Sequence, residues 1–181
     1  MNSATKNLEN DHVYILRLID VMEKITGINR PDIGNLETVV NLIKNYADGM
    51  HHAKEENLFF PMLAKKGFSL QQGPVAVMLQ EHTQGRKFVS GIVEGIRKYK
   101  EGDENAVQEI FGNMKGYISL LRNHIAKENN ILFRMADKVL NDNDNHILLN
   151  EFSKVEKGKS GEILSDSWIR SIENLEDLYM H

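Results

Sequence analysis

Two segments of the sequence contain metal-ligand residue types in the same order. The first is HHAKEENLFFPM at residues 51–62, and the second is HIAKENNILFRM at residues 124–135. Each contains a histidine followed four residues later by a glutamate, which pairs His51 with Glu55 and His124 with Glu128. Residues four apart lie on one face of a helix, about 6 Å apart along its axis. An imidazole and a carboxylate placed in this way can bind one metal ion or two neighbouring ions.

The alignment of the two segments also chooses between two adjacent pairs. His52 and Glu56 have the same spacing as His51 and Glu55, but the second segment contains no counterpart to them. Neighbouring positions on an α-helix point about 100° apart. We therefore predict that His51 and Glu55 face inward, and that His52 and Glu56 form a pair on the surface.

Apolar residues recur at helical spacing along four segments. These segments, which turns separate, cover roughly residues 5–26, 31–66, 69 or 74 to 100, and 105–140. Long helices joined by short turns are typical of an up-down-up-down four-helix bundle, so we predict an all-α fold. The apolar stripe of the last helix is expected to continue through Ile131 and Met135. Each helix has one histidine at a core-facing position, and these are His12, His51, His82 and His124.

The C-terminal part of the chain is expected to form a helical extension. The run NDNDN at residues 141–145 breaks the helical pattern, so the predicted division is a bundle of residues 1–141 and an extension of residues 142–181 that packs on it. The composition of KGKSG at residues 157–161 is typical of a flexible connection. Two short helices are expected to bury Ile147, Leu148 and Phe152, and Trp168, Ile172, Leu175 and Tyr179. We expect a monomer or a weak dimer, because such a stripe more often packs on its own bundle than on a partner.

The inward-facing polar residues are the candidate metal ligands. One buried histidine alone usually finds a hydrogen bond, but two buried carboxylates with only Arg86 on the same stripes would be costly to leave unpaired. Six side chains exceed a tetrahedral zinc site, so two ions are expected. Two irons, bridged by the carboxylates and by an oxo or hydroxo group, would keep an open position for dioxygen or nitric oxide. Manganese and zinc also accept these ligands. The six candidates are His12, His51, Glu55, His82, His124 and Glu128.

Residues near these ligands have two possible roles each. Asp11 and Glu81 precede candidate histidines and either hold a neighbouring imidazole nitrogen or are solvated. Tyr117 is a hydrogen-bond donor, a proton source or a core tyrosine. We expect Lys54 and Lys127 to be solvated flanks of the two motifs.

Composition excludes several classes of function. The net charge is −4, which gives no basic footprint for nucleic acid or an anionic membrane. The absence of cysteine excludes disulfides, thiolate metal sites and cysteine nucleophiles. No apolar run approaches the length of a membrane span and the N-terminus lacks an apolar signal core, so we expect a cytoplasmic protein.

The two motifs closely resemble those of hemerythrin-like proteins, the HHE cation-binding family. DHVYIL around His12 and QEHTQGR around His82 are similar to the other ligand sites of that family. The resemblance extends over roughly residues 8–140, and the tail EFSKVEKG is similar to tails in the family. It implies a four-helix bundle with a carboxylate-bridged non-haem di-iron centre, held by the six candidate residues.

The resemblance leaves several functions open, because the family includes oxygen carriers, redox and iron sensors, and iron–sulfur cluster repair proteins. Oxygen carriers have a further histidine four residues after the third-helix one, where this chain has Arg86. Repair proteins typically add an N-terminal domain with cysteine, which this sequence lacks. We expect a di-iron protein that binds or reacts with dioxygen, nitric oxide or peroxide in redox sensing or stress protection. The alternatives are an enzyme-like role in cluster repair, iron donation or nitric oxide or peroxide turnover, and an iron-responsive interaction module; sequence alone does not decide whether the protein is an enzyme.

Overall fold

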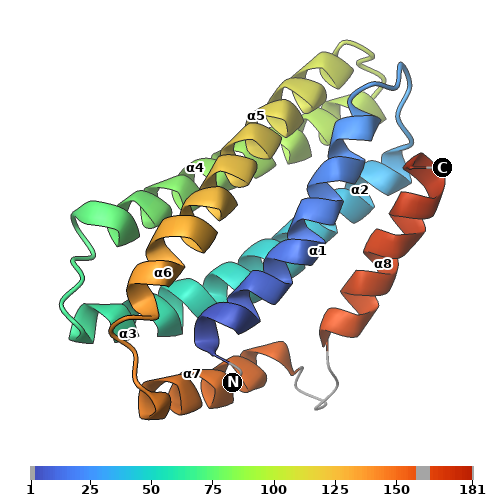
Figure 1. The fold of residues 1–181 in the computed structure, drawn as a ribbon. Coiled ribbons are helices and arrows are strands. Elements are labelled where there is room, and N and C mark those ends of the chain that lie inside the picture. Colours follow the sequence, from blue (N-terminus) through green and yellow to red (C-terminus); the bar gives the residue numbers. More distant parts are fainter. Residues whose placement is uncertain (1–2, 158–163, 181) are drawn as a thin grey trace.

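Four antiparallel helical rods form the body of the protein. A computed structural model describes residues 3–157 and 164–180, and all regular elements among them are helices. Figure 1 shows that consecutive rods run in opposite directions, which confirms the predicted all-α up-down-up-down bundle. The first and third rods are single helices, α1 (Ala4–Ile25) and α4 (Gly73–Lys100). None of the described helices is long and apolar enough to cross a membrane.

The second and fourth rods each contain π-helical turns. The second rod consists of α2 (Ile33–Leu42), η1 (Ile43–His52), η2 (Glu55–Phe59) and α3 (Phe60–Lys65). The fourth consists of α5 (Ala106–Lys127), η3 (Glu128–Leu132) and α6 (Phe133–Ala136). The π turns coincide with the two repeated motifs, and π-bulges in α-helices are frequent at functional sites. The wider turn also changes which side chains face inward.

The change of register corrects one prediction for the last rod. Ile131 and Met135 were expected on its buried stripe, but both are exposed. Leu132 and Phe133 are buried in their place. The reason is that η3, which begins at Glu128, has more residues per turn than an α-helix. The positions that face the core therefore move by one residue.

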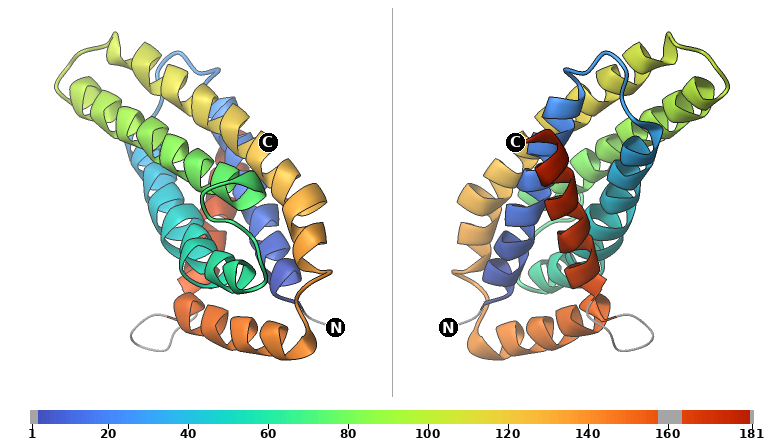
Figure 2. Two further views of the ribbon diagram at one scale, coloured as in Figure 1. Left: turned by 90° about the vertical axis from the view of Figure 1, so that its left-hand side faces the viewer. Right: turned by 90° about the vertical axis from the view of Figure 1, so that its right-hand side faces the viewer.

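The C-terminal extension packs against the bundle. Helix α7 (Asp142–Glu156) crosses one end of it, and α8 (Leu164–Tyr179) lies along α1 and α2 (Figures 1 and 2). The stripe of α8 packs as predicted, since Ile172 and Leu175 are buried and Trp168 contacts Tyr46 with 5.9 Å between ring centroids. In α7, Leu148 and Phe152 are buried as predicted, whereas Ile147 is exposed. The predicted flexible residues 158–161 lie outside the part of the chain that the structure describes.

The core consists of two apolar clusters with a polar layer between them. Along α1, Leu8 belongs to one cluster and Ile15 to the other, and His12 lies between them. The other rods contribute buried histidines and glutamates at the same level. Buried polar groups need partners, so the layer must be satisfied within the protein or by a bound ion.

Local sequence signals fix the helix ends and the close packing of rods three and four. The Ser3 side chain caps α1 by accepting a hydrogen bond from the backbone N–H of Lys6 at 3.1 Å. Gly102, with φ of +98°, ends α4 in the left-handed region. Gly116 lets α5 approach α4 closely, because a Cβ there would lie 2.4 Å from Cε1 of Phe88.

Candidate metal centre

The structure brings all six predicted ligand residues into the polar layer, and adds a seventh residue. Two groups of side chains each place one possible ligand atom per residue within 4.8 Å of the others. Glu55 belongs to both groups. The first group is His12, His51, Glu55 and Glu128, and the second is His52, Glu55, His82 and His124.

The four predicted histidines form two pairs with close ring nitrogens. Nε2 of His12 lies 3.0 Å from Nε2 of His51, and Nε2 of His82 lies 3.1 Å from Nε2 of His124. Each pair consists of one histidine from a single-histidine segment and one from a His-x-x-x-Glu motif. The two-fold repeat of the sequence is therefore visible as two equivalent pairs in the bundle.

Each glutamate contacts one histidine from each pair. The two oxygens of Glu55 lie 3.6 Å from Nε2 of His51 and 3.4 Å from Nε2 of His82. Oε2 of Glu128 lies 3.3 Å from Nε2 of both His12 and His124. Each carboxylate therefore lies between the two pairs, where it could contact two ions.

These contacts fit bound metal ions better than hydrogen bonds. All four oxygens of Glu55 and Glu128 are buried without a hydrogen-bond partner among the described residues. A buried carboxylate without a partner is strongly unfavourable. Two ligand atoms that are each about 2.1 Å from one ion lie roughly 3.0–3.4 Å apart at angles of about 90–110°. The nitrogen–oxygen distances of 3.3–3.6 Å are close to this range.

Acceptor groups hold the other ring nitrogen of the histidines. In each of the four predicted histidines, Nδ1 lies 2.7 to 3.0 Å from a side-chain oxygen of another residue. His12 contacts Asn129, His51 contacts Asp11, His82 contacts Glu56, and His124 contacts Glu81. An acceptor at Nδ1 favours the tautomer whose Nε2 lone pair is free for a metal. Asp11 and Glu81 thus hold imidazole nitrogens, one of the two roles considered from the sequence. Asn129 was not among the predicted residues, and its only signal in the sequence is its place next to Glu128.

The prediction of a surface pair at His52 and Glu56 is wrong. His52 is 5% exposed, and its ring stacks on that of His82 with 3.8 Å between centroids. Glu56 accepts a hydrogen bond from His82 instead of pairing with His52. His52 ends η1, where the wider π turn reduces the angle between consecutive side chains, so it faces inward beside His51.

The prediction of two solvated lysines is also wrong for Lys54. Its side chain is fully buried, and Nζ donates to Asn7 at 2.9 Å and to Glu156 of α7 at 2.8 Å. It also lies 2.6 Å from Oδ2 of Asp11. Lys127, at the equivalent place in the second motif, remains 37% exposed and pairs with Glu81. The extension covers only the first motif, which explains the difference.

Arg86 supports the second group from outside. Its guanidinium donates to Asp48 at 2.9 Å and to Glu56 at 2.7 Å. Asp48 lies 3.2 Å from Nδ1 of His52, and Glu56 lies 2.7 Å from Nδ1 of His82. One arginine therefore fixes both carboxylates that orient these two imidazoles.

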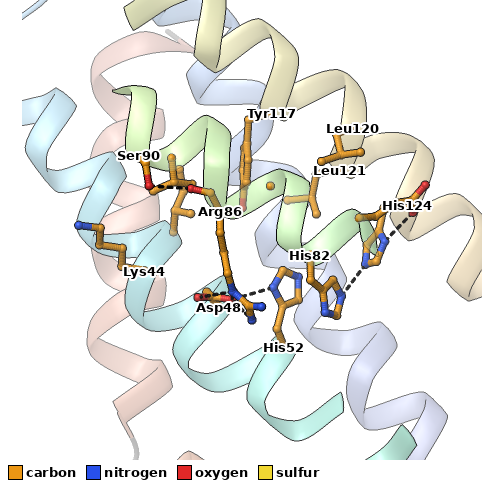
Figure 3. Close-up of a pocket in the computed structure, with 14 residues that line it drawn as sticks. Lys44, Asp48, His52, His82, Arg86, Ser90, Tyr117, Leu120, Leu121 and His124 are labelled. Carbon is orange, nitrogen blue, oxygen red and sulfur yellow. Dashed lines mark hydrogen bonds and ion pairs between the residues drawn. The ribbon is translucent and has the colours of Figure 1, made fainter. Parts of the chain in front are cut away.

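A pocket of about 160 Å³ reaches only the second group. His52, His82 and His124 line it, whereas His12 and His51 do not. Figure 3 shows these three side chains at one end, with Tyr117 entering from α5 and Arg86 from α4. The two groups therefore differ in access: a small molecule in this pocket would meet the histidines of the second group and not His12 or His51.

Residues 3–136 match the family described as hemerythrin HHE cation binding domain, which is most of the chain. The protein belongs to this family. The six residues predicted as ligands all lie within the matched region, as does His52. Membership explains the His/Glu layer, because cation binding requires buried nitrogen and oxygen ligands.

Several relatives of this hemerythrin-like chain are named iron-sulfur cluster repair proteins. A probable iron-sulfur cluster repair protein of Haemophilus influenzae is 29% identical over 130 residues, which are 69% of this chain and 56% of the relative. YtfE of Escherichia coli O157:H7 is 30% identical over 88 residues, 48% of this chain and 40% of the relative. YtfE of Yersinia pseudotuberculosis is 33% identical over 89 residues with the same shares. The chain spans about half the length of the curated relatives it matches.

Burial and neighbouring charges shift the pKa values of the imidazoles of the hemerythrin-like centre in opposite directions. Burial lowers the pKa of His51, and it lowers the pKa of His52 to about 3. Burial also acts to lower the pKa of His82, but the nearby carboxylate of Glu55 and the hydrogen bond to Glu56 outweigh it and raise that pKa to about 9. Within the second group, one imidazole is therefore neutral and another is cationic when no metal is bound.

The pKa of Glu128 is lowered, despite its burial, by neighbouring charges. Burial acts to raise its pKa, but the charge of His124 and the contacts with His12 outweigh burial and lower it. The glutamate is thus anionic, and the charge of neighbouring protonated imidazoles balances it. A divalent ion would replace those protons, so metal binding at this centre should release protons.

Proposed function

We propose that this hemerythrin-like chain binds two non-haem irons and that the irons bind or react with dioxygen, nitric oxide or peroxide in redox sensing or stress protection. The observation that supports this most strongly is that two ligand groups share Glu55 while four buried carboxylate oxygens lack hydrogen bonds. Glu55 and Glu128 would bridge the ions, since each contacts a histidine from both pairs. Iron would supply electron transfer to the bound molecule.

The ligands of the two ions would differ in number. We assign His12 and His51 to the first ion and His52, His82 and His124 to the second. Glu55, which belongs to both groups, and Glu128, which contacts His12 and His124, would be shared. His52 would take the role of an additional nitrogen ligand in a chain that has Arg86 four residues after His82. Because the pocket reaches only the second group, the small molecule would bind at that ion.

Further aspects of the function are part of the same proposal. Residues 142–181 would act as an extension of the bundle of residues 1–141. We propose a cytoplasmic monomer or weak dimer that contacts neither nucleic acid nor membrane, in keeping with the net charge of −4.

Metal analysis of protein isolated without added metal tests the proposal. We expect about two irons per chain, together with the visible absorption of a bridged ferric pair. Glu55→Gln and Glu128→Gln should each lose both irons together, since each carboxylate contacts both positions. The control is Glu94→Gln, which changes a half-exposed glutamate of α4 outside both ligand groups. Protein that contains zinc alone, or a Glu55→Gln variant that keeps both irons, would contradict the assignment.

A second candidate function is iron–sulfur cluster repair or iron donation, which the names of the relatives favour. It differs from binding in that iron or electrons leave the protein. Transfer of iron to an acceptor protein lacking its cluster, or turnover of many equivalents of nitric oxide or peroxide, would favour this function. Stoichiometric binding without transfer would favour sensing.

A further inference from the structure

The pocket at the second ligand group is larger than a diatomic molecule requires. Its volume is about 160 Å³. One water molecule occupies about 30 Å³ of liquid, and an apolar cavity of about 150 Å³ can bind benzene. The pocket extends along α4 from His82 to Val89, seven residues or about 10 Å. It therefore has room for a molecule with about six non-hydrogen atoms.

The walls of the pocket are largely apolar beyond the histidines. Ile43, Val89, Leu120 and Leu121 line it. Gly85 widens it, because a Cβ at this position would lie 3.5 Å from Cε2 of Tyr117, an ordinary contact that the glycine leaves unused. An apolar group of the ligand would thus be removed from water.

The hydroxyl group of Tyr117 is a polar group in the wall of the pocket. The Tyr117 hydroxyl makes no hydrogen bond among the described residues, although the side chain is only 3% exposed. Figure 3 shows the side chain pointing into the pocket. An edge of its ring lies beside Gly85, since a Cβ there would be 3.5 Å from Cε2 of Tyr117, and Gly85 is three residues along α4 from His82. The hydroxyl is available to donate a hydrogen bond to an oxygen atom of a molecule in the pocket.

The side-chain charges around the pocket are already paired or solvated. Arg86 pairs with both Asp48 and Glu56. Lys44 is exposed, so water solvates its charge. An organic anion would therefore gain no buried unpaired side-chain cation among the described lining residues, and only the bound metal ion would offset its loss of hydration. A neutral ligand has no such loss to offset.

We propose that the pocket binds a neutral organic hydroperoxide with a compact apolar group of about four carbons. The hydroperoxide oxygens would lie between the Tyr117 hydroxyl and the second ligand group, and the apolar group would lie against Val89 and Leu121. This inference rests on the proposed metal centre and specifies which peroxide it would accept. It concerns binding alone, with no bond formed or broken within the ligand.

Calorimetric titration of the zinc-loaded protein tests the inference without redox turnover. We expect tert-butyl hydroperoxide to bind at least tenfold more tightly than hydrogen peroxide. The reason is that burial of each methylene-sized group raises the affinity by up to about fourfold. Tyr117→Phe should weaken binding of tert-butyl hydroperoxide about fivefold. Equal affinity for the two peroxides, or tighter binding of butanoate, would overturn the proposed ligand class.

Variants at Gly85 test the location of the bound molecule. Gly85→Val should lower the affinity for tert-butyl hydroperoxide at least tenfold and change the affinity for hydrogen peroxide less than twofold. Gly85→Ala should have an intermediate effect and should fold normally, because a Cβ at this position makes only ordinary contacts. Gly112→Ala is the control, because a Cβ on that exposed α5 glycine meets nothing within 4 Å. Unchanged affinity in Gly85→Val and Gly85→Ala would contradict binding in this pocket. Two irons per chain without a hydroperoxide preference would overturn the inference alone, whereas a chain that binds no metal would overturn the proposed function with it.

Discussion

Nζ of Lys54 lies 2.6 Å from Oδ2 of Asp11, the same oxygen that lies 3.0 Å from Nδ1 of His51. Lys54 also donates to Glu156 at the end of α7. A buried lysine therefore joins the C-terminal extension to a candidate metal ligand through one carboxylate. The pKa of Asp11 is raised by burial, and Lys54 opposes that shift.

Lys54→Met should destabilise the protein by about 3–5 kcal/mol, because it leaves Asp11 and Glu156 without their buried partner. Urea unfolding of the metal-free protein measures this change. The matched control is Lys127→Met at the equivalent position of the second motif, where the half-exposed pair with Glu81 should be worth less than about 1 kcal/mol. Equal losses in the two variants would show that the Lys54 network does not contribute as the structure indicates.

His52→Ala should weaken one of two metal-binding steps and leave the other nearly unchanged. The reason is that His52 belongs only to the second ligand group, whereas the first group keeps all its members. Metal titration followed by calorimetry would separate the two steps. His146→Ala, which removes an exposed histidine of α7, serves as the control. Two unaffected steps would exclude His52 as a ligand.

Arg86→Met should lower metal affinity about 10–100-fold, the usual effect of losing a group that orients ligands. Asp48 and Glu56 would lose their shared cation, and the imidazoles of His52 and His82 would lose their fixed orientation. The measurement is competition for iron with a chelator of known affinity. Arg97→Met, on the exposed part of the same helix, should have no effect.

Arg86→His places an imidazole one turn beyond His82, as in the oxygen-carrying type of site. Because Arg86 lines the pocket beside the second ligand group, the new side chain should alter the visible spectrum of the iron-loaded protein under dioxygen. Spectra recorded anaerobically and after addition of dioxygen provide the comparison. A spectrum identical to that of the unmodified protein would place residue 86 away from the open position.

The start of α7 should loosen below about pH 4. The hydrogen bond from Lys66 and the backbone N–H of Asn141 lower the pKa of Asp144 in the folded protein. A lowered folded pKa contributes stability above the unfolded value of about 3.9, and this contribution is lost as the pH falls through the folded value. Thermal unfolding should therefore show Asp144→Asn less stable than the unmodified protein at pH 7, with a difference that becomes smaller as the pH falls below about 4. Asp142→Asn is the exposed control, and a difference independent of pH would contradict the assignment.

Much of the fold and of the layer was predictable because it depends on local spacing. The periodic apolar residues and the turn signals predicted four helices, and the structure has four rods at those positions. The repeat of His-x-x-x-Glu predicted that His51, Glu55, His124 and Glu128 face one another, since a helix fixes the direction of residues four apart. All four are buried in one layer.

The π turns and the contacts between distant segments are decided only by the tertiary structure. His52 was predicted to lie on the surface because the prediction assumed α-helical geometry. In the structure, the π-helical turn of η1 directs the His52 side chain inward. Lys54 and Lys127 occupy equivalent positions in the sequence, but α7 covers only Lys54. Side-chain direction on a regular helix follows from the sequence alone, whereas helical register and burial depend on which other elements pack against the helix.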